Sequence, residues 1–262
     1  MGRVKLTVAY DGTAYSGWQI QPNAVTVEGV LTDALSRLLQ EPVALLGASR
    51  TDAGVHALGN VAAFDTEHPI PPEKIAYAVN AYLPDDIRVM RSEAVAPDFH
   101  PRFDCYEKCY EYRITIGAFA SPLTRLYAHH QRRPLDVAAM EQAAQAFVGT
   151  HDFSSFCSAG AQVQDKVRTI SSLHVQELER LAEDGEDGGS LVAIRVVGNG
   201  FLYNMVRILA GTLMQVGNHE RRPEEMSAVL EAKDRRKAGP TAPAKGLRLC
   251  YIRYGEEKSH NK

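Results

Sequence analysis

Strand-like and helix-like hydrophobic patterns follow one another in the same order twice along the chain, and this constrains the fold more than any other feature. Residues 4–10 alternate apolar and polar side chains, as in a strand with one buried face. Apolar residues at helical spacing follow Thr26, a residue type that caps helix N-termini. Two strand-like runs come next, then a helical stretch after Pro71–Pro72 and a strand-like run at 87–95. The order predicted for the first half is β-α-β-β-α-β.

The second half repeats this order with one extra helix. Its expected elements are a strand at 106–116, a helix at 136–148, strands at 167–178 and 191–197, helices at 201–215 and 223–233, and a strand at 247–254. Gly217 is expected to end the helix at 201–215. We therefore predict an α+β fold of two ferredoxin-like halves, residues 1–100 and 101–262. They would share one mixed, mostly antiparallel sheet with helices on one face, a topology that also occurs in RNA-binding modules.

Composition limits the class of protein. Hydrophobic residues make up 45% and charged residues 23% of the chain, the balance of a soluble globular protein. No apolar run reaches the roughly eighteen residues of a membrane span, and residues 1–12 do not resemble a secretory signal. The four cysteines are scattered without zinc-site spacing. We therefore expect a cytoplasmic protein that does not contact membranes and has neither a structural metal nor a disulfide.

The charge distribution is uneven. The net charge is -3, which by itself argues against a nucleic-acid partner. Six acidic residues gather at 177–187, which predicts a solvated hairpin tip. Between residues 198 and 254 there are ten Lys or Arg against five Asp or Glu. Because polyanion binding depends on local basic surface, an RNA partner remains compatible with this chain.

The segment GASRTDAGVHA at 47–57 carries the most informative group of chemical side chains. It lies between two predicted strands, where small residues let a backbone approach a ligand closely. Arg50 stands two residues before Asp52, and a nearby cation lowers the pKa of an acid. From these residues alone, an ion pair that merely stabilises the loop is the simpler interpretation.

The RTDAGVHA part of this segment resembles the catalytic loop of the tRNA pseudouridine synthase A family. The other segments that resemble this family are YDGTAYSGWQIQP at 10–22, NAYLPDDIRV at 80–89, FHPRFDCYEKCYEYRI at 99–114, GNGFLYNMVRILAGTLMQVG at 198–217 and PTAPAKGLRL at 240–249. The resemblance therefore extends from about residue 4 to residue 254. Ser49 departs from the family, which usually has Gly before the Arg.

The resemblance implies the pseudouridine synthase fold and an isomerase that converts uridine to pseudouridine at positions 38, 39 and 40 of the tRNA anticodon stem-loop. It places the catalytic nucleophile on Asp52, the substrate-contacting tyrosine on Tyr110 and an active-site arginine on Arg207. Arg50 would keep Asp52 charged and oriented, or fill the space that a flipped base leaves. Family members act as homodimers, without cofactor or metal. Asp52 could attack C1′, add to C6 of the base, or take a sugar proton in a glycal route.

Simpler interpretations of the other residues remain open. Tyrosines on strands, such as Tyr110, are usually core residues, and Arg207 alone would be a surface arginine. On the helix at 201–215, Asn204, Arg207 and Gly211 share one face by their spacing. His56 is left out of the catalytic set. Tyr15 and Trp18 could equally pack the rim of the site or contact RNA.

Two other functions compete with the isomerase. One is a catalytically silent RNA-binding protein of the same fold. The other is a carboxylate-dependent hydrolase such as a nucleosidase, which would need a second acid or a metal to activate water. No such pair of groups is evident in the sequence, and release of free uracil would reveal this activity.

Overall fold

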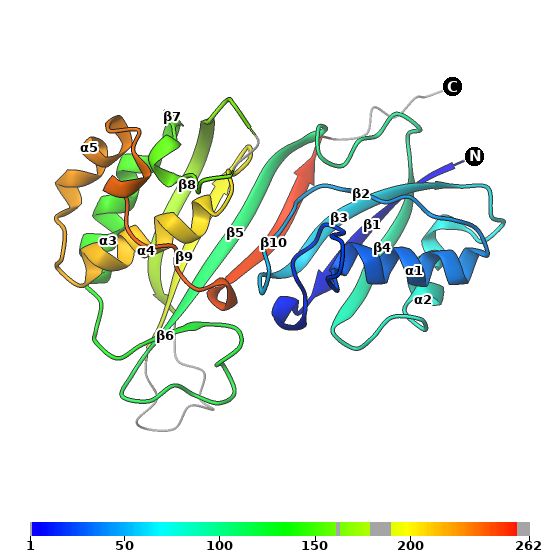
Figure 1. The fold of residues 1–262 in the computed structure, drawn as a ribbon, viewed down its shortest axis with the longest axis horizontal. Coiled ribbons are helices and arrows are strands. Elements are labelled where there is room, and N and C mark those ends of the chain that lie inside the picture. Colours follow the sequence, from blue (N-terminus) through cyan, green and yellow to red (C-terminus); the bar gives the residue numbers. More distant parts are fainter. Residues whose placement is uncertain (1, 161–162, 179–189, 256–262) are drawn as a thin grey trace. The chain divides into compact units, whose positions relative to one another are not determined.

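The chain divides into two compact units, and the division falls inside two long strands. The computed structural model describes residues 2–160, 163–178 and 190–255. Unit 1 comprises residues 1–108 and 249–262, and unit 2 comprises residues 109–248. Strands β5 (Cys105–Ile116) and β10 (Leu247–Tyr254) therefore have residues in both units (Figure 1). The boundary predicted from the sequence was residue 100, because a pattern along the chain cannot assign one part of a strand to a distant segment.

Unit 1 has the element order expected from its sequence. Its elements are β1 (Gly2–Tyr10), α1 (Val27–Leu39), β2 (Leu46–Gly47), β3 (His56–Thr66), α2 (Pro72–Val79) and β4 (Ile87–Val95). The strands lie in the order β4-β1-β3-β10, and β2 pairs with β3. β1 is antiparallel to both of its neighbours. The predicted β-α-β-β-α-β order is confirmed.

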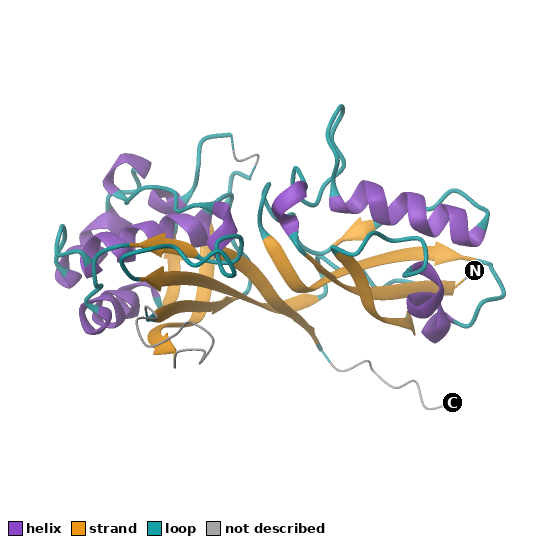
Figure 2. Cartoon of the chain, turned by 90° about the horizontal axis from the view of Figure 1, so that it is seen from below, coloured by secondary structure: helices purple, strands orange, loops and turns teal. Residues whose placement is uncertain are grey.

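The core of unit 1 follows the two-residue period of β1. Val4, Leu6 and Val8 are buried, whereas the residues between them are partly exposed. Helix α1 lies along one face of the strands (Figure 2) and contacts α2. It begins where the sequence predicted, because Thr26 Oγ1 accepts a hydrogen bond from the Gly29 N–H at 3.3 Å. This arrangement leaves the loops at the strand ends to carry the chemical residues.

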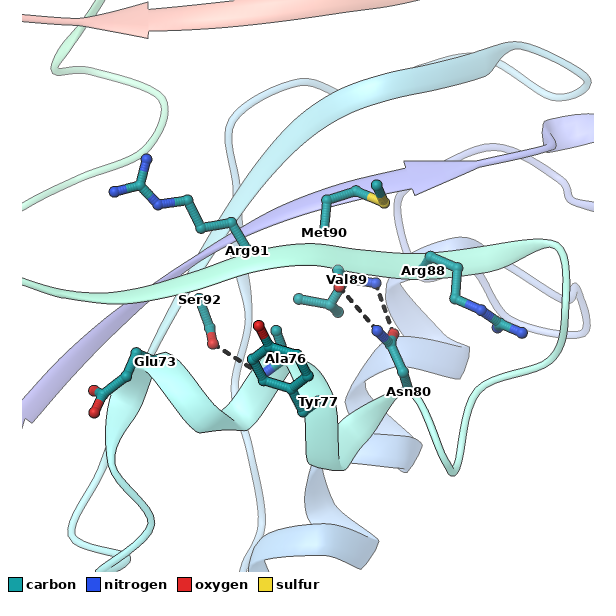
Figure 3. A pocket seen from close by; sticks show the side chains of 9 residues that line it. All are labelled: Glu73, Ala76, Tyr77, Asn80, Arg88, Val89, Met90, Arg91 and Ser92. Atoms are coloured by element: carbon teal, nitrogen blue, oxygen red, sulfur yellow. Dashed lines mark hydrogen bonds between the residues drawn. The ribbon is translucent and has the colours of Figure 1, made fainter.

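Helix α2 covers the edge strand β4. The Asn80 side chain accepts from the Val89 N–H at 2.8 Å and donates to the Val89 carbonyl at 2.9 Å. Ser92 Oγ accepts from the Ala76 N–H at 2.8 Å (Figure 3). The two Asn80 bonds satisfy backbone groups that an open sheet edge would offer to another chain, and the Ser92 bond satisfies an N–H of helix α2. The groove between α2 and β4 has a volume of about 540 Å³, and it contains none of the residues predicted as catalytic.

Unit 2 carries the remaining elements. They are most of β5, then β6 (His129–Gln131), α3 (Val137–Ala144), β7 (Gly149–Asp152), β8 (Val167–Leu178), β9 (Leu191–Gly198), α4 (Met205–Gly217), α5 (Met226–Glu231) and the start of β10. Strands β5-β9-β8-β7 follow one another, and β6 lies beside β5 in parallel orientation. The β8 pairs are antiparallel. Helices α3, α4 and α5 gather on one side of these strands (Figure 2). The predicted α+β class with a mixed, mostly antiparallel sheet is confirmed.

Three details of unit 2 differ from the sequence prediction, and a fourth prediction is not tested. Helix α4 begins at Met205 instead of residue 201, because Asn204 has a φ of 60° and breaks the helix there. Gly217 does not end α4 by adopting a positive φ; the left-handed residue is His219, with a φ of 59°. A Cβ on Gly217 would lie 2.6 Å from Met140 Sδ, so this glycine lets α4 pack closely on α3. The short strands β6 and β7 were not predicted. The predicted acidic hairpin tip lies mostly outside the described residues.

Glu111 is a buried carboxylate among arginines in unit 2. Its Oε1 accepts from Arg113 Nε and from an Arg248 nitrogen, both at 2.8 Å, and its Oε2 lies 3.7 Å from Arg195. Burial alone would raise the pKa of Glu111, but the hydrogen bond from Arg113 and the charge of Arg248 outweigh it and lower the pKa. The folded state therefore favours the charged form of Glu111.

The first testable consequence concerns the pH dependence of stability. Glu111→Gln should destabilise the protein by about 2 kcal/mol at pH 7, because it weakens the charge-assisted hydrogen bonds that Arg113 and Arg248 donate to this buried carboxylate. A lowered folded-state pKa contributes stability that is present above the ordinary value of 4.5 and lost as the pH falls further. The difference between wild type and Glu111→Gln, measured by urea unfolding, should therefore shrink below pH 4.5. Asp85→Asn, at a fully exposed side chain, is the control and should change stability by less than about 0.5 kcal/mol. A pH-independent difference for Glu111→Gln would contradict the assignment.

Candidate functional site

The loop between β2 and β3 carries Arg50 and Asp52. Along this loop buried and accessible side chains alternate: Ser49 and Thr51 are buried, whereas Arg50 is exposed and Asp52 partly exposed. The buried side chains hold the backbone against the unit, and the two charged side chains remain accessible. A fixed loop that presents accessible charged groups is a common form of catalytic site.

The neighbouring strands fix this loop from one side. The Tyr10 hydroxyl, at the end of β1, lies 2.6 Å from Thr51 Oγ1. The Asn60 side-chain amide, on β3, donates to the Ser49 carbonyl at 3.0 Å. Tyr10 and Asn60 are themselves buried. Two residues that flank Arg50 are thus held by polar groups that the sheet orients.

The segment that follows β1 fixes the loop from the other side. The backbone N–H of Trp18 donates to the Thr51 carbonyl at 3.0 Å, and the backbone N–H of Gly54 donates to the Tyr15 carbonyl at 3.3 Å. The Trp18 and Tyr15 side chains are buried, and the Tyr15 hydroxyl donates to Asp86 at 2.6 Å. Of the two roles left open for these aromatic residues, the structure shows packing around the loop.

Glycines in the same segment allow this close approach. A Cβ on Gly12 would lie 2.0 Å from the Val55 carbonyl oxygen. Gly17 has a φ of 91°, and its Cβ would lie 2.6 Å from the Thr51 carbonyl oxygen. Side chains at these positions would displace the loop that carries Asp52. The YDGTAYSGW segment therefore packs directly against the backbone of the RTDAGVHA loop.

His56 closes the loop at the start of β3. It is buried, and its Nδ1 accepts the Gly12 N–H at 3.1 Å. Because that nitrogen accepts, the neutral ring carries its proton on Nε2. Asp11 also lies 3.1 Å from Nδ1, a contact that becomes an ion pair only when the ring is protonated. His56 holds the loop, and its position gives no reason to add it to the catalytic set.

Arg50 does not form the direct ion pair with Asp52 that was expected from the sequence. Among the residues that the structure describes, the exposed Arg50 guanidinium has neither a hydrogen bond nor an ion pair, so it is not paired with Asp52. The expectation that Arg50 orients Asp52 by direct pairing is not met in this structure. Its guanidinium is instead accessible to an incoming anion or base.

Lys108 is a charged neighbour of the loop that the sequence analysis did not single out. It lies on β5 and is buried, and its Nζ donates to the Ala48 carbonyl at 2.7 Å. Burial lowers the pKa of its ammonium group. The sequence does place Lys108 on the same face of the strand as Tyr110, because the two residues are two positions apart. A single lysine on a strand usually reaches solvent, however, so this spacing alone did not indicate that Lys108 is buried.

Tyr110 belongs to unit 2 and is buried. Its ring meets the Phe201 ring edge-on, with centroids 5.3 Å apart and planes at 83°. Of the strand face that the sequence analysis expected, Tyr110, Tyr112 and Ile114 are buried, whereas Tyr106 is largely exposed. The packing of Tyr110 against Phe201 fixes the direction of its ring within unit 2.

Arg207, in the first turn of α4, is held against the loop that precedes β10. Its Nε donates to the Ala242 carbonyl at 2.7 Å, and its NH1 donates to Asn204 Oδ1 at 2.8 Å. On the same helix face, a Cβ on Gly211 would lie 1.9 Å from the Pro240 carbonyl oxygen. Arg207 and Gly211 lie on the same face of α4, against the 240–242 segment, as predicted; Asn204 lies just before the helix and contacts Arg207 from there. Arg207 is thus a positioned arginine and not a freely solvated one.

The predicted site residues are therefore distributed over the two units. Arg50 and Asp52 lie on one loop of unit 1, whereas Tyr110 and Arg207 lie on β5 and α4 of unit 2. Among residues 2–160, 163–178 and 190–255, no cluster of three or more His, Cys, Asp or Glu side chains could hold a metal ion. None of the helices described is both long enough and apolar enough to cross a membrane.

Comparison with known proteins places this chain. A family model described as tRNA pseudouridine synthase matches residues 6–104 and 143–255. A protein of Brevibacillus brevis named tRNA pseudouridine synthase A is 48% identical over 254 residues, which are 97% of this chain and 100% of that protein. The protein of the same name from Ruminiclostridium cellulolyticum is 47% identical over 254 residues, with the same coverage. A solved H/ACA ribonucleoprotein bound to a substrate RNA matches 97% of this chain and 49% of its own, at 12% identity and a TM-score of 0.35, too low to carry an argument.

The family model defines the class, an isomerase that makes pseudouridine in tRNA. The two relatives match over their whole lengths, and their shared name narrows the class to one family. This chain belongs to the tRNA pseudouridine synthase A family.

Proposed function

We propose that this protein isomerises uridine to pseudouridine at positions 38, 39 and 40 of the tRNA anticodon stem-loop, with Asp52 as the nucleophile. Tyr110 contacts the substrate uracil, Arg207 binds an anionic group at the site, and Arg50 enters the space that the flipped nucleotide leaves. The active form is a homodimer, and the reaction uses no cofactor. The observation that carries the assignment is the Asp52 loop, which is held by buried polar groups while Asp52 itself is partly exposed.

The chemistry explains why a carboxylate is sufficient. The bond between C1′ and N1 of uridine breaks, the uracil turns, and C1′ bonds to C5. C5 loses its hydrogen to solvent and N1 gains one, so every heavy atom of the product comes from the substrate. Asp52 can begin this sequence by attacking C1′, by adding to C6, or by taking a sugar proton. In each route the target base must first leave its stack to reach the loop.

The arginines suit this task for different reasons. Arg50 is exposed and free of protein partners among the described residues, so a bound RNA can engage it without breaking an existing ion pair. Arg207 is already oriented by Ala242 and Asn204, so it is prepared to hold one fixed geometry. The guanidinium group suits both roles, because it binds phosphate and carboxylate through paired hydrogen bonds.

The test maps the product on tRNA. Wild-type protein is incubated without added cofactor with an unmodified tRNA that carries uridines at positions 38, 39 and 40. Pseudouridine is then located by mass spectrometry after a pseudouridine-specific chemical tag, because the two isomers have equal mass. We expect conversion at these positions and none in a matched tRNA that has cytidine there. Conversion elsewhere would contradict the positional assignment, and free uracil would indicate a hydrolase. Binding without conversion would support a silent RNA-binding protein.

A further inference from the structure

Lys108 is a buried cation whose position the proposed chemistry does not yet use. Its side chain is only 8% exposed, and its Nζ donates to the Ala48 carbonyl at 2.7 Å. Ala48 is the first residue after β2, where the loop that carries Asp52 leaves the sheet. The Ala48 N–H is also bound, to the Val61 carbonyl at 2.8 Å. Both backbone groups of Ala48, the residue from which the loop starts, are thus hydrogen-bonded.

Within the part of the chain that the structure describes, no carboxylate balances the charge of Lys108. Among the described residues, no ion pair includes Lys108, and the groups that face it are the Ala48 carbonyl, the Cys105 thiol and the Arg102 guanidinium. Burying an ammonium group without a counter-ion is costly, and an uncharged side chain of the same length would avoid that cost. A purely structural requirement at this position would be met more easily by methionine or leucine. In this structure the ammonium group is used in the hydrogen bond to the Ala48 carbonyl.

This bond differs in kind from the other anchors of the loop. Ser49 and Thr51 are held by neutral donors, the Asn60 amide and the Trp18 N–H. A charged donor makes a hydrogen bond roughly twice as strong as a neutral one. Lys108 therefore adds a strong restraint four residues before Asp52.

We propose that Lys108 is a positioning residue for Asp52: its ammonium group holds the Ala48 carbonyl and so sets the direction in which the Asp52 loop leaves β2. Lys108 itself touches neither the substrate nor the reacting atoms. This inference rests on the proposed nucleophilic role of Asp52. Loss of the restraint should slow the chemical step, because a displacement of about 1 Å at a reacting group can cost about a hundred-fold in rate.

The experiment compares Lys108→Met, Lys108→Gln and Lys108→Arg in the full-length protein. The rate is measured as release of tritium from C5 of labelled uridine in tRNA. Lys108→Met should lower kcat by about ten- to a hundred-fold, equivalent to about 1.4–2.7 kcal/mol. The KM for tRNA should change by less than about three-fold, because Lys108 does not bind RNA in this proposal. Lys108→Arg should restore most of kcat, and Lys108→Gln, a neutral donor, should fall between the other two.

The matched control is Lys5→Met in the same unit. Lys5 is also largely buried, but its Nζ binds Glu93 at 2.7 Å and not the loop. Lys5→Met should lower the melting temperature and leave kcat unchanged. Three outcomes would overturn the inference: an unchanged kcat for Lys108→Met, a rise in KM alone, or an arginine variant no more active than the methionine variant. If Lys108→Met does not fold, the other two variants provide the test: a higher kcat for Lys108→Arg than for Lys108→Gln supports the inference, and the reverse order contradicts it.

A second readout separates this inference from the proposed function. Hydrogen exchange of residues 47–57 is measured in wild type, Lys108→Met and Lys5→Met. Faster exchange in Lys108→Met alone supports the anchoring role, whereas equal exchange in all three contradicts it. Neither result depends on activity. If wild type makes no pseudouridine, the proposed function fails while the exchange data still report on the loop.

Discussion

Asp52→Asn is expected to abolish pseudouridine formation while the protein still folds and binds tRNA. The amide has nearly the shape of the carboxylate, but it is a poor nucleophile and carries no charge. Removal of a catalytic nucleophile commonly lowers kcat by several orders of magnitude, so we expect a loss of at least about a thousand-fold. The measurements are tritium release from C5 of uridine and, separately, tRNA affinity by filter binding.

Two further variants make the result specific. Asp52→Glu keeps the charge but moves the carboxylate by one methylene, and it should also lose about a hundred-fold or more, because the loop is fixed and cannot compensate. Asp33→Asn, at an exposed position on α1, removes an equal charge from the same unit and should leave kcat unchanged. Full activity of Asp52→Asn would show that another group initiates the reaction. Loss of tRNA binding by Asp52→Asn would make its inactivity uninformative about the nucleophile.

The elements that local patterns define were predictable from the sequence. Strand β4 was predicted with the bounds that the structure shows, Ile87–Val95, and Thr26 caps α1 as its residue type suggests. These features depend on neighbours two to four residues away, which a single sequence displays. The shared face of Arg207 and Gly211 was predictable for the same reason, because helical spacing is a local property.

Features that depend on distant residues were not predictable in this way. The start of α4 shifts because Asn204 takes a left-handed conformation. Gly217, the last residue of α4, packs closely against α3 and does not take the left-handed conformation expected of it. Lys108 binds a carbonyl sixty residues away, so no local pattern shows whether it is solvated or buried. The lack of pairing between Arg50 and Asp52 also depends on a backbone held by Trp18 and Tyr10, not on their separation in sequence.

The loop that carries Asp52 is therefore best understood as the product of several long-range restraints. Asn60, Tyr10, Trp18 and Lys108 come from four different segments, and each holds a backbone or side-chain group within the four residues before Asp52. Such a loop resists deformation because no single rotation relieves all of its bonds. A backbone clash in the segment that follows β1 should therefore displace Asp52 as well, because the loop cannot absorb the movement elsewhere.

Gly17→Ala is expected to lower both the stability and the activity of the protein. Gly17 has a φ of 91°, and a Cβ there would lie 2.6 Å from the Thr51 carbonyl oxygen, next to Asp52. The positive φ alone costs an alanine about 1–2 kcal/mol, and a clash with backbone adds about 1–3 kcal/mol. We expect a total loss of about 4 kcal/mol in unfolding free energy, together with a fall in kcat, because relief of the clash requires the Thr51–Asp52 backbone to move.

Gly160→Ala separates the two contributions. Gly160 has a similar φ of 87°, but nothing lies within 4 Å of its added Cβ. This variant should therefore lose only the 1–2 kcal/mol of backbone strain, measured by urea unfolding, and should keep the kcat of wild type. The difference between the two variants measures the clash with Thr51. If Gly17→Ala loses no more stability than Gly160→Ala and remains fully active, the close approach of this segment does not position Asp52. The restraints on the loop would then have to come from β1, β3 and Lys108 alone.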